Sequence, residues 1–292
     1  MNLIIQGEDV PTPELKALHR LSRGEAVERI SDEAFRITRA DPSTRPQVAQ
    51  HAARAKLDYG FVEEGRTLGD FGLLAMDMDS TLISIECIDE IADFAGRKAE
   101  VAAVTAAAMR GEIDWPESLR RRVKSLAGLD ASSLARVYEE RLRFNKGAQK
   151  LLAAAKRNGV KTLLVSGGFT YFTDRVRGEL GFDFAYSNTL DVEGAKLAGT
   201  VSGPLVDAAG KAGHVARLKK ELGIARERVV AIGDGANDLP MMEEAGTSIA
   251  YHAKPVVKAK ADYALDYAGL DGLLNLFPDS SGLSSSRWGK GK

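Results

Sequence analysis

The sequence predicts an α/β protein: a Rossmann-like parallel sheet core with an inserted helical cap and a small N-terminal α+β domain. Residues 71–76 form a short apolar run bounded by turn residues, which is typical of a strand buried in a parallel sheet. From residue 147 onward, β-rich runs alternate with helical patterns, which indicates parallel strands joined by helices. Residues 81–148 show helical spacing without strand signals, so we interpret them as an insertion into the sheet.

Composition places the chain among ordinary globular proteins. Of its 292 residues, 44% are hydrophobic and 28% charged, and the net charge is -1. This charge gives no argument for nucleic acid or an anionic membrane as a partner. Cys87 is the single cysteine, so we expect no internal disulfide and a reducing compartment, the cytoplasm. No apolar run approaches the roughly 18 residues of a membrane span, and the N-terminus does not resemble a signal peptide.

The first 70 residues carry no obvious chemistry and predict a small α+β domain of ferredoxin-like type. The expected elements are strands at 2–6, 26–30 and 34–38 and helices at 12–22 and 46–57. Thr12 stands before Pro13, so we expect it to be the N-cap of the first helix. The last strand of such a unit cannot be placed from the pattern. The domain could sense a small ligand, form a homodimer or serve only for packing, and the residues leave these open.

The remaining domains follow from the patterns of the chain. We expect the core to comprise residues 71–80 and 149–278, and the helical cap residues 81–148. Residues 279–292 are rich in Ser, Gly and Lys and predict a flexible tail. Arg120, Arg121 and Arg122 stand together in the cap. They form either a solvated helix face or a face with one member directed into a site.

Two aspartates end the strand predicted at 71–76. Asp77 and Asp79 are one residue apart and should lie at the carboxyl end of this strand, where open α/β sheets bind ligands. Two carboxylates so close repel each other unless a cation lies between them or one holds a proton. The pattern therefore predicts a metal-assisted acid site. A strand followed by a capped turn, with Asp79 and Ser80 starting a helix, explains this stretch equally well.

Further polar residues follow other strands. Ser166 and its glycines end the strand at 160–165, and Asp234 and Asp238 follow the strand at 229–232. Lys211 lies at the start of a helix at 210–222. Strand ends of a parallel sheet share one edge, so these groups should converge on a phosphate and metal site. Separately, Ser166 could only cap a helix, Lys211 could be solvated, and the loop at 233–238 could be a turn.

Taken together, these segments resemble the haloacid-dehalogenase superfamily of phosphohydrolases. The resemblance rests on DMDST, SGG, the lysine and GDGAND, and it extends from about residue 72 to about residue 272. Within the superfamily, DMDSTLISIECIDEIA, MRGEIDWPESLRRRV, VSGGF and IGDGANDLPMMEEAG are similar to the phosphoserine phosphatase family. The first 70 residues lie outside the match and resemble at most the small regulatory modules of some such enzymes.

The resemblance implies a mechanism with an aspartyl-phosphate intermediate. Asp77 would be the nucleophile, and Asp79 would protonate the leaving oxygen and then deprotonate the attacking water. The resemblance also implies Mg²⁺, a hard cation that prefers oxygen ligands. Its ligands would be the Asp77 carboxylate, the Asp79 carbonyl and Asp234, with Asp238 orienting a ligand water or Lys211. The phosphoryl oxygens would be held by Ser166, the Gly167 amide and Lys211.

The resemblance places substrate recognition in the cap. Glu86 would face the substrate ammonium and Arg122 its carboxylate, which suits an amino acid with one charge of each sign. Met109 and Trp115 would form an apolar lid, and Asn237 would contact the substrate or hold the cap closed. The family more often has Phe where Trp115 stands. This difference bears on the size of the pocket and not on the type of reaction. The implied activity is hydrolysis of O-phospho-L-serine to L-serine, the last step of serine synthesis.

Two other functions remain as alternatives. The same fold could act on another small phosphomonoester or transfer the phosphoryl group to another acceptor. A non-catalytic protein that senses a ligand with an inactive core is a third hypothesis, although every expected catalytic position is filled.

Overall fold

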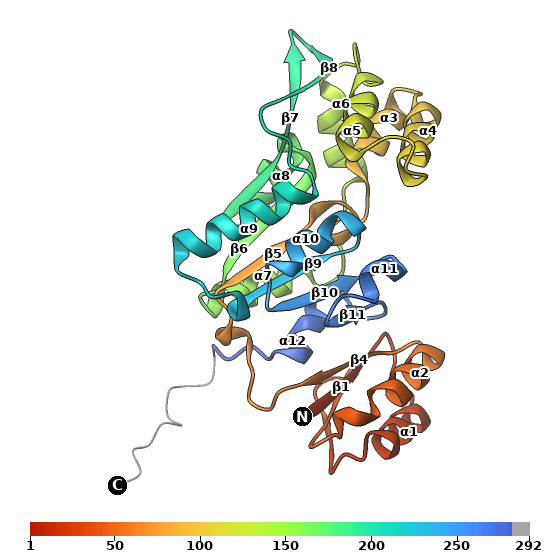
Figure 1. Ribbon diagram of the computed structural model, residues 1–292, viewed down its shortest axis with the longest axis vertical. Helices are drawn as coiled ribbons and strands as arrows, with labels where there is room; N and C mark the ends of the chain where they lie inside the picture. Colours follow the sequence, from red (N-terminus) through yellow and green to blue (C-terminus); the bar gives the residue numbers. More distant parts are fainter. Residues whose placement is uncertain (282–292) are drawn as a thin grey trace.

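The computed structural model describes residues 1–281, and residues 282–292 lie outside the described part. The predicted tail at 279–292 therefore falls almost entirely outside it. Two sheets and a helical cap make up the molecule, with the cap and the N-terminal sheet at opposite ends (Figure 1). The α/β fold class is confirmed.

The core is a seven-stranded sheet of order β11-β10-β9-β5-β6-β7-β8. All neighbouring strands pair in parallel except β7 and β8, which form an antiparallel hairpin. The strands are β5 (Leu73–Met76), β6 (Lys161–Phe169), β7 (Phe184–Glu193), β8 (Lys196–Ser202), β9 (Val229–Gly233), β10 (Thr247–Tyr251) and β11 (Tyr263–Leu265). The central strands β5 and β9 are buried along their whole length, which explains why both read as continuous apolar runs.

Helices cover both faces of this sheet. On one face Leu74 and Met76 of β5 pack with α7, α8 and α12, and on the other Leu73 and Ala75 pack with α9, α10 and α11. The helices are α7 (Ala148–Arg157), α8 (Thr170–Leu180), α9 (Ala208–Leu222), α10 (Leu239–Glu243), α11 (Pro255–Lys258) and α12 (Leu273–Leu276). The alternation of side chains along β5 thus builds the two layers of the core.

The expected end of the strand at 160–165 is wrong. The strand expected to end at residue 165 continues to Phe169, so Ser166 and its glycines lie within β6 rather than after it. The pairing of β6 with β7 shifts register between Val165 and Phe169. Such an irregularity in the pairing can re-aim side chains at the end of a strand without ending the strand.

The segment expected to form the cap is helical. Its helices are α3 (Cys87–Phe94), α4 (Lys98–Met109), α5 (Trp115–Lys124) and α6 (Ser132–Arg136). The β7–β8 hairpin rises from the core and reaches this cap (Figure 1). Leu197 of β8 accepts a backbone hydrogen bond from Gly128 and donates one to Leu129, both at 2.9 Å. The hairpin therefore ties the cap to the sheet.

The N-terminal segment folds as a βαββαβ unit with an antiparallel sheet of order β2-β3-β1-β4, the arrangement of a ferredoxin-like domain. Its elements are β1 (Asn2–Gln6), α1 (Thr12–Ser22), β2 (Val27–Arg29), β3 (Ala34–Ile37), α2 (Arg45–Ala55) and β4 (Asp58–Val62). The strand that the pattern could not place is β4. Thr12 is the first residue of α1 rather than its N-cap, because Pro11 occupies that position.

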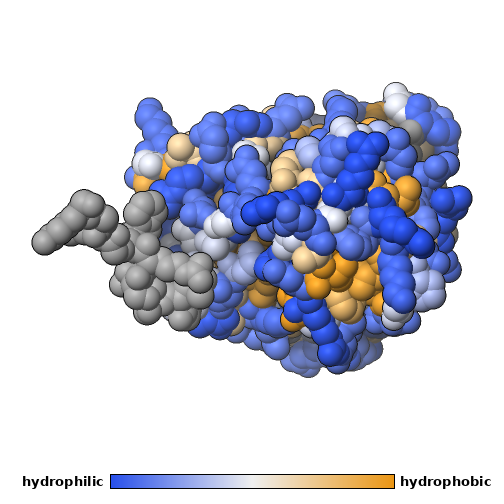
Figure 2. Space-filling model, turned by 90° about the horizontal axis from the view of Figure 1, so that it is seen from below, coloured by the Kyte–Doolittle hydropathy of each residue, from blue (hydrophilic) through white to orange (hydrophobic). Residues whose placement is uncertain are grey.

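The surface seen from below is mostly hydrophilic, with a small apolar patch between polar side chains (Figure 2). Within residues 1–281, none of the helices combines the length and the apolar character needed to cross a membrane.

Candidate active site

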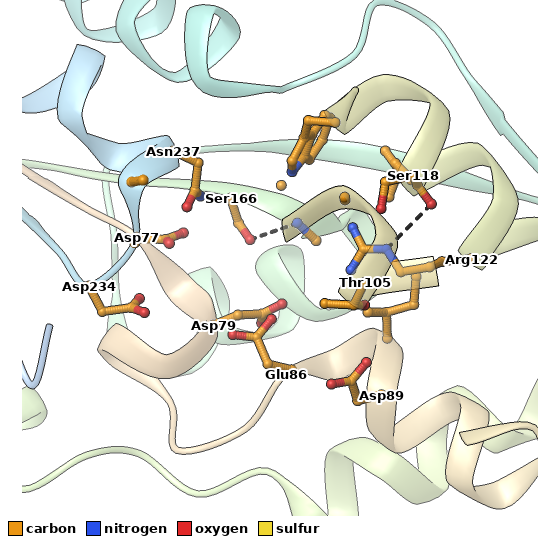
Figure 3. A pocket seen from close by; sticks show the side chains of 18 of the residues that line it. Asp77, Asp79, Glu86, Asp89, Thr105, Ser118, Arg122, Ser166, Asp234 and Asn237 are labelled. Carbon is orange, nitrogen blue, oxygen red and sulfur yellow. Dashed lines mark hydrogen bonds between the residues drawn. The ribbon is translucent and has the colours of Figure 1, made fainter. Parts of the chain in front are cut away.

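A cavity of about 490 Å³ lies at the carboxyl ends of β5, β6 and β9, where the cap meets the core (Figure 3). Core residues, among them Asp77, Ser166 and Asp234, line one side, and cap residues such as Trp115 and Arg122 line the other. The structure therefore brings most of the residues singled out in the sequence to one place, although they are spread over more than 150 positions.

A buried lysine joins two carboxylates at the floor of this cavity. Lys211 Nζ lies 2.7 Å from Asp77 Oδ1 and 2.7 Å from Asp238 Oδ1. Lys211 is 1% exposed, so it is not a solvated lysine. Burial opposes its charge, but the Asp238 and Asp77 carboxylates raise the pKa of Lys211 above its usual value. Lys211 is therefore a fixed positive charge beside Asp77.

Asp238 is held from both sides. Its Oδ1 accepts from Lys211, and its Oδ2 accepts from the backbone N–H groups of Asp234 and Gly235 at 3.1 and 3.0 Å. It is completely buried. With both oxygens engaged, Asp238 orients the loop that follows β9, and the loop is more than a simple turn.

Asp234 receives a hydrogen bond from a residue that the sequence did not single out. Thr81 Oγ1 donates to Asp234 Oδ1 at 2.9 Å. Burial raises the pKa of Asp234 to about 6, and the Asp238 carboxylate adds to the rise. Burial also raises the pKa of Asp77, with Asp238 contributing in the same direction and Lys211 opposing. The site therefore holds more negative charge than its lysine compensates.

This donor set fits a metal cation. Asp77, Asp234 and Asp238 each present a carboxylate oxygen within 4.8 Å of the others. Five carboxylates line the cavity against three cationic side chains, Arg122, Lys211 and Lys254, among the residues that the structure describes. Carboxylate oxygens suit hard divalent cations. Because the oxygens of Asp238 are already bonded, Asp77 and Asp234 are the better placed ligands.

Asp79 stands two residues after Asp77, in a segment with unusual backbone geometry. Its Oδ1 is buried and has no hydrogen-bond partner within the described residues. Burial, with the Glu86 carboxylate, raises the pKa of Asp79 to about 8. The next residue, Ser80, has φ of 57°, in the left-handed region, and its hydroxyl donates to Glu86 Oε1 at 2.7 Å. The backbone at Ser80 therefore brings the Glu86 carboxylate back toward Asp79, as Figure 3 shows.

The glycine-rich end of β6 lines the cavity beside Asp77, because β6 pairs directly with β5. Ser166 Oγ accepts from the Gly168 N–H at 2.9 Å, and the cap position of α8 belongs to Phe169, so Ser166 does not cap that helix. Asn188 fixes the same segment, because its Nδ2 donates to the Gly167 carbonyl at 2.9 Å. A Cβ on Gly167 would lie 2.9 Å from Trp115 Cζ2. Only glycine therefore lets the Trp115 ring pack this closely on the strand.

The cap contributes charged groups to the cavity. Arg122 of α5 lines it, whereas Arg121 forms an ion pair with Glu117 on the surface, 2.7 Å away. Arg122 Nε donates to the Ser118 carbonyl at 3.4 Å, and its guanidinium faces the cavity (Figure 3). Burial lowers the pKa of Arg122, while Asp89 and Glu86 oppose this. One arginine of the triplet therefore points inward, as one of the two interpretations of the sequence allowed.

The other expected residues are placed as follows. Glu86 and Asn237 line the cavity. Met109 is the last residue of α4, and its side chain lies outside the described part. Cys87 is buried, and burial with the Asp79 carboxylate raises the pKa of its thiol, so it is an inert core residue.

Four residues of the site were missed in the sequence. Asp89 and Lys254 line the cavity, Thr81 holds Asp234, and Asn188 holds Gly167. Two of these had a signal: Asp89 lies one helical turn after Glu86, and Lys254 follows the end of β10. Thr81 and Asn188 act on partners distant in the sequence, which no local pattern reveals.

Comparisons with known proteins agree with this fold. A model of the haloacid dehalogenase-like hydrolases matches residues 74–243, and a model of a domain of unknown function matches residues 3–48. The chain belongs to the haloacid dehalogenase-like hydrolase family, and it is an enzyme.

Individual relatives narrow the assignment. The phosphoserine phosphatase of Polaromonas sp. (strain JS666) is 55% identical over 214 residues, 72% of this chain and 91% of the relative. The unliganded structure of a probable phosphoserine phosphatase from Vibrio cholerae is 36% identical, with a TM-score of 0.83 over 97% of this chain and 87% of that one. The structure of a phospho-aspartyl intermediate analogue of phosphoserine phosphatase is 37% identical. It has a TM-score of 0.66 and covers 71% of this chain and 99% of that one. Within the hydrolases, the chain belongs to the phosphoserine phosphatases.

Proposed function

We propose that the protein is a Mg²⁺-dependent phosphatase that hydrolyses O-phospho-L-serine to L-serine and phosphate through an aspartyl phosphate on Asp77. The observation that supports this best is the division of one cavity into two halves. The core half holds a nucleophile beside a buried lysine, and the cap half presents Glu86 and the Arg122 guanidinium. A substrate with a phosphate at one end and both charges of an amino acid at the other matches this division.

In the first step, an oxygen of Asp77 attacks phosphorus. The contacts of the carboxylate, from Met78 N–H and Lys211, both fall on Oδ1, which leaves Oδ2 for the attack. The Asp77–phosphorus bond forms as the bond from phosphorus to the seryl oxygen breaks. Asp79 donates its proton to the leaving oxygen, and a pKa of about 8 keeps Asp79 protonated at neutral pH.

In the second step, water attacks the phosphorus of the aspartyl phosphate. Asp79 now takes the proton of the water, and the Asp77 carboxylate leaves. Throughout, Lys211, Ser166 and the Gly167 N–H would hold the phosphoryl oxygens, and these three residues line the same cavity as Asp77. Fixed charges and dipoles in a site closed to water supply most of the stabilisation of such a transition state.

Mg²⁺ would be held by the Asp77 and Asp234 carboxylates and the Asp79 carbonyl, with Asp238 orienting Lys211 and the loop. When bound, it neutralises charge on the phosphoryl group. The excess of carboxylates in the cavity supports this assignment.

Substrate recognition is assigned to the cap. The nitrogens of Arg122 not bonded to Ser118 face the cavity and suit a carboxylate through two parallel hydrogen bonds. Glu86 would bind the ammonium, with Trp115 and Met109 closing the pocket and Asn237 contacting the substrate. The role in serine synthesis, the cytoplasmic location, the domain borders at 70, 80, 148 and 278 and a homodimer stay predictions.

The deciding experiment measures phosphate release from L-phosphoserine with Mg²⁺, beside phosphothreonine, sugar phosphates and an aryl phosphate. We expect L-phosphoserine to lead by orders of magnitude and Asp77→Asn to be inactive. If another phosphoester leads and Arg122→Ala changes nothing, the substrate assignment is wrong while the chemistry at Asp77 stands. If no phosphomonoester is hydrolysed, the proposed function is wrong altogether.

A further inference from the structure

The N-terminal domain is fixed to the core rather than loosely attached. Ile4 of β1 and Val62 of β4 belong to the same buried apolar cluster as Leu276 and Phe277 of the core. Gln6, 1% exposed, accepts from Asn275 Nδ2 at 2.6 Å. An apolar interface with satisfied polar groups disfavours relative motion of two domains. The Vibrio cholerae structure matches 97% of this chain, so the same two parts coexist there.

A buried carboxylate forms the centre of this interface. Asp58 of β4 is 4% exposed and accepts three backbone hydrogen bonds, from Asp266 at 2.8 Å, Tyr267 at 3.0 Å and Ala268 at 2.8 Å. We call residues 266–271, which follow β11, the docking loop. A charged acceptor for three consecutive N–H groups fixes the backbone of this loop more firmly than neutral contacts do.

The docking loop in turn contacts the chain that returns from the cap. Leu270 N–H donates to the Lys146 carbonyl at 2.8 Å, and Lys150 forms an ion pair with Asp271 at 2.8 Å. Gly147 has φ of 83° and lies so close to Asp271 that a Cβ would not fit. Independently, Lys146 Nζ lies 3.2 Å from Glu33 of the N-terminal domain.

The returning chain pairs with the chain that leaves for the cap. Ser84 N–H donates to the Arg143 carbonyl at 3.0 Å, and Asn145 N–H donates to the Leu82 carbonyl at 2.9 Å. We call these paired segments, residues 82–84 and 143–145, the hinge ribbon. Both covalent connections of the cap run through the hinge ribbon, so any movement of the cap relative to the core must bend it.

The hinge ribbon ends at the metal site. Asn145 Nδ2 donates to the Thr81 carbonyl at 2.8 Å, and Thr81 Oγ1 donates to Asp234 Oδ1 at 2.9 Å. A continuous series of contacts therefore runs from Asp58 through the docking loop and the hinge ribbon to Asp234.

We propose that the N-terminal domain braces the hinge ribbon and Asp234 through the docking loop, with Asp58 and Asn145 as positioning residues for the cation site. Without this brace the hinge ribbon opens more often, and Asp234 spends less time in the geometry that binds the cation. The proposal rests on the proposed function only for Asp234 as a metal ligand.

The test uses the full-length protein without substrate. Asp58→Asn keeps the shape of the side chain but turns its NH₂ toward one of the three N–H donors. We expect amide hydrogen exchange at residues 266–268 and 143–147 to accelerate about tenfold, the effect of losing one good hydrogen bond. The Kd for Mg²⁺, measured by calorimetry, should rise about threefold to tenfold, as for an indirect coupling. Faster exchange confined to 266–268, with an unchanged Kd, overturns the proposal.

Two further variants separate bracing from general loosening. Asn275→Ala removes an interface hydrogen bond outside the docking loop and should leave the Kd for Mg²⁺ unchanged. A rise in the Kd equal to that of Asp58→Asn would contradict the proposed route.

A double variant tests whether Asp58 and Asn145 act on the same route. Combined with Asn145→Ala, Asp58→Asn should raise the Kd for Mg²⁺ by less than the product of the single effects. If Asp58→Asn does not fold, Asp271→Asn, which weakens the contact of the docking loop with Lys150, must still accelerate exchange at 143–147.

Hydrolysis enters none of these readouts. Failure to cleave L-phosphoserine would therefore refute the proposed function and leave the brace untouched. Normal hydrolysis by the wild type, together with no change in exchange at 143–147 in Asp58→Asn, would refute the brace and leave the proposed function in place.

Discussion

The Nζ of Lys211 lies 2.7 Å from Oδ1 of Asp77, and both side chains are almost completely buried. Such a pair is not primarily a source of stability, because removing two charges from water costs about as much as their attraction returns. Its value lies in fixing a positive charge beside Asp77, the proposed nucleophile. The same charge that stabilises the carboxylate in the resting protein can hold a phosphoryl oxygen during the reaction.

Removing the lysine charge should destabilise the fold. Lys211→Met leaves Asp77 and Asp238 buried without their cation, and we expect the free energy of unfolding to fall by about 3–5 kcal/mol. Urea unfolding in EDTA measures this. Lys161→Met, which breaks the exposed pair with Asp183, is the matched control and should cost about 1 kcal/mol or less. Equal losses for the two variants would show that the buried pair has no special role.

The hydroxyl of Thr81 should matter for metal affinity rather than for folding. Thr81→Val keeps the shape of the side chain and removes the hydrogen bond to Asp234 Oδ1. Loss of such a partner of a metal ligand weakens metal binding by about 10-fold to 100-fold. Calorimetric titration with Mg²⁺ checks this. Thr105→Val, whose hydroxyl bonds to its own helix, is the control and should bind Mg²⁺ normally. An unchanged Mg²⁺ affinity in Thr81→Val would show that Asp234 is not a ligand of the proposed metal site.

Arg122 should act on binding of the substrate carboxylate. Arg122→Ala is expected to raise KM for L-phosphoserine about 100-fold, since a charge-assisted pair is worth roughly 2–3 kcal/mol. For O-phosphoethanolamine, which has the ammonium but no carboxylate, KM should not change. Arg121→Ala removes the neighbouring surface arginine and should leave both substrates unaffected. Equal effects of Arg122→Ala on both substrates would assign Arg122 to the phosphate or to packing.

The sequence predicted the convergence of the site because of a property of parallel sheets. Asp77, Ser166 and Asp234 each follow or end an apolar run, and the carboxyl ends of parallel strands share one edge. The motif resemblance added the cap residues Glu86 and Arg122, which no strand rule could place.

The remaining features depend on tertiary contacts. The strand β4 (Asp58–Val62) contains Gly60, and a Cβ there would meet Leu276 and Tyr263 of the core. A glycine lowers the local strand signal, although the interface requires it. Thr81 and Asp234 are 153 positions apart, and Asn188 lies 21 positions from Gly167, so neither hydrogen bond leaves a local pattern.

The protonation of Asp79 should set the alkaline limit of the first step. Burial, with Glu86, raises its pKa from 3.8 to about 8, so the carboxyl holds its proton at pH 7 and loses it above pH 8. Formation of the aspartyl phosphate needs that proton for the leaving oxygen. We therefore expect its rate in single-turnover experiments to be level between pH 6.5 and pH 7.5 and to fall about tenfold per pH unit above roughly pH 8.5.

The same experiment can identify Asp79 as the group that titrates. Glu86→Gln removes the carboxylate that raises the pKa of Asp79, so the decline should begin at lower pH. Asp89→Asn removes a neighbouring carboxylate that is not among the main causes of this shift, and it should leave the break point nearly in place. A leaving group that needs no proton, such as 4-nitrophenol, should abolish the decline in the wild type, because the acid is then dispensable. A decline that persists with 4-nitrophenyl phosphate would assign it to a group other than Asp79.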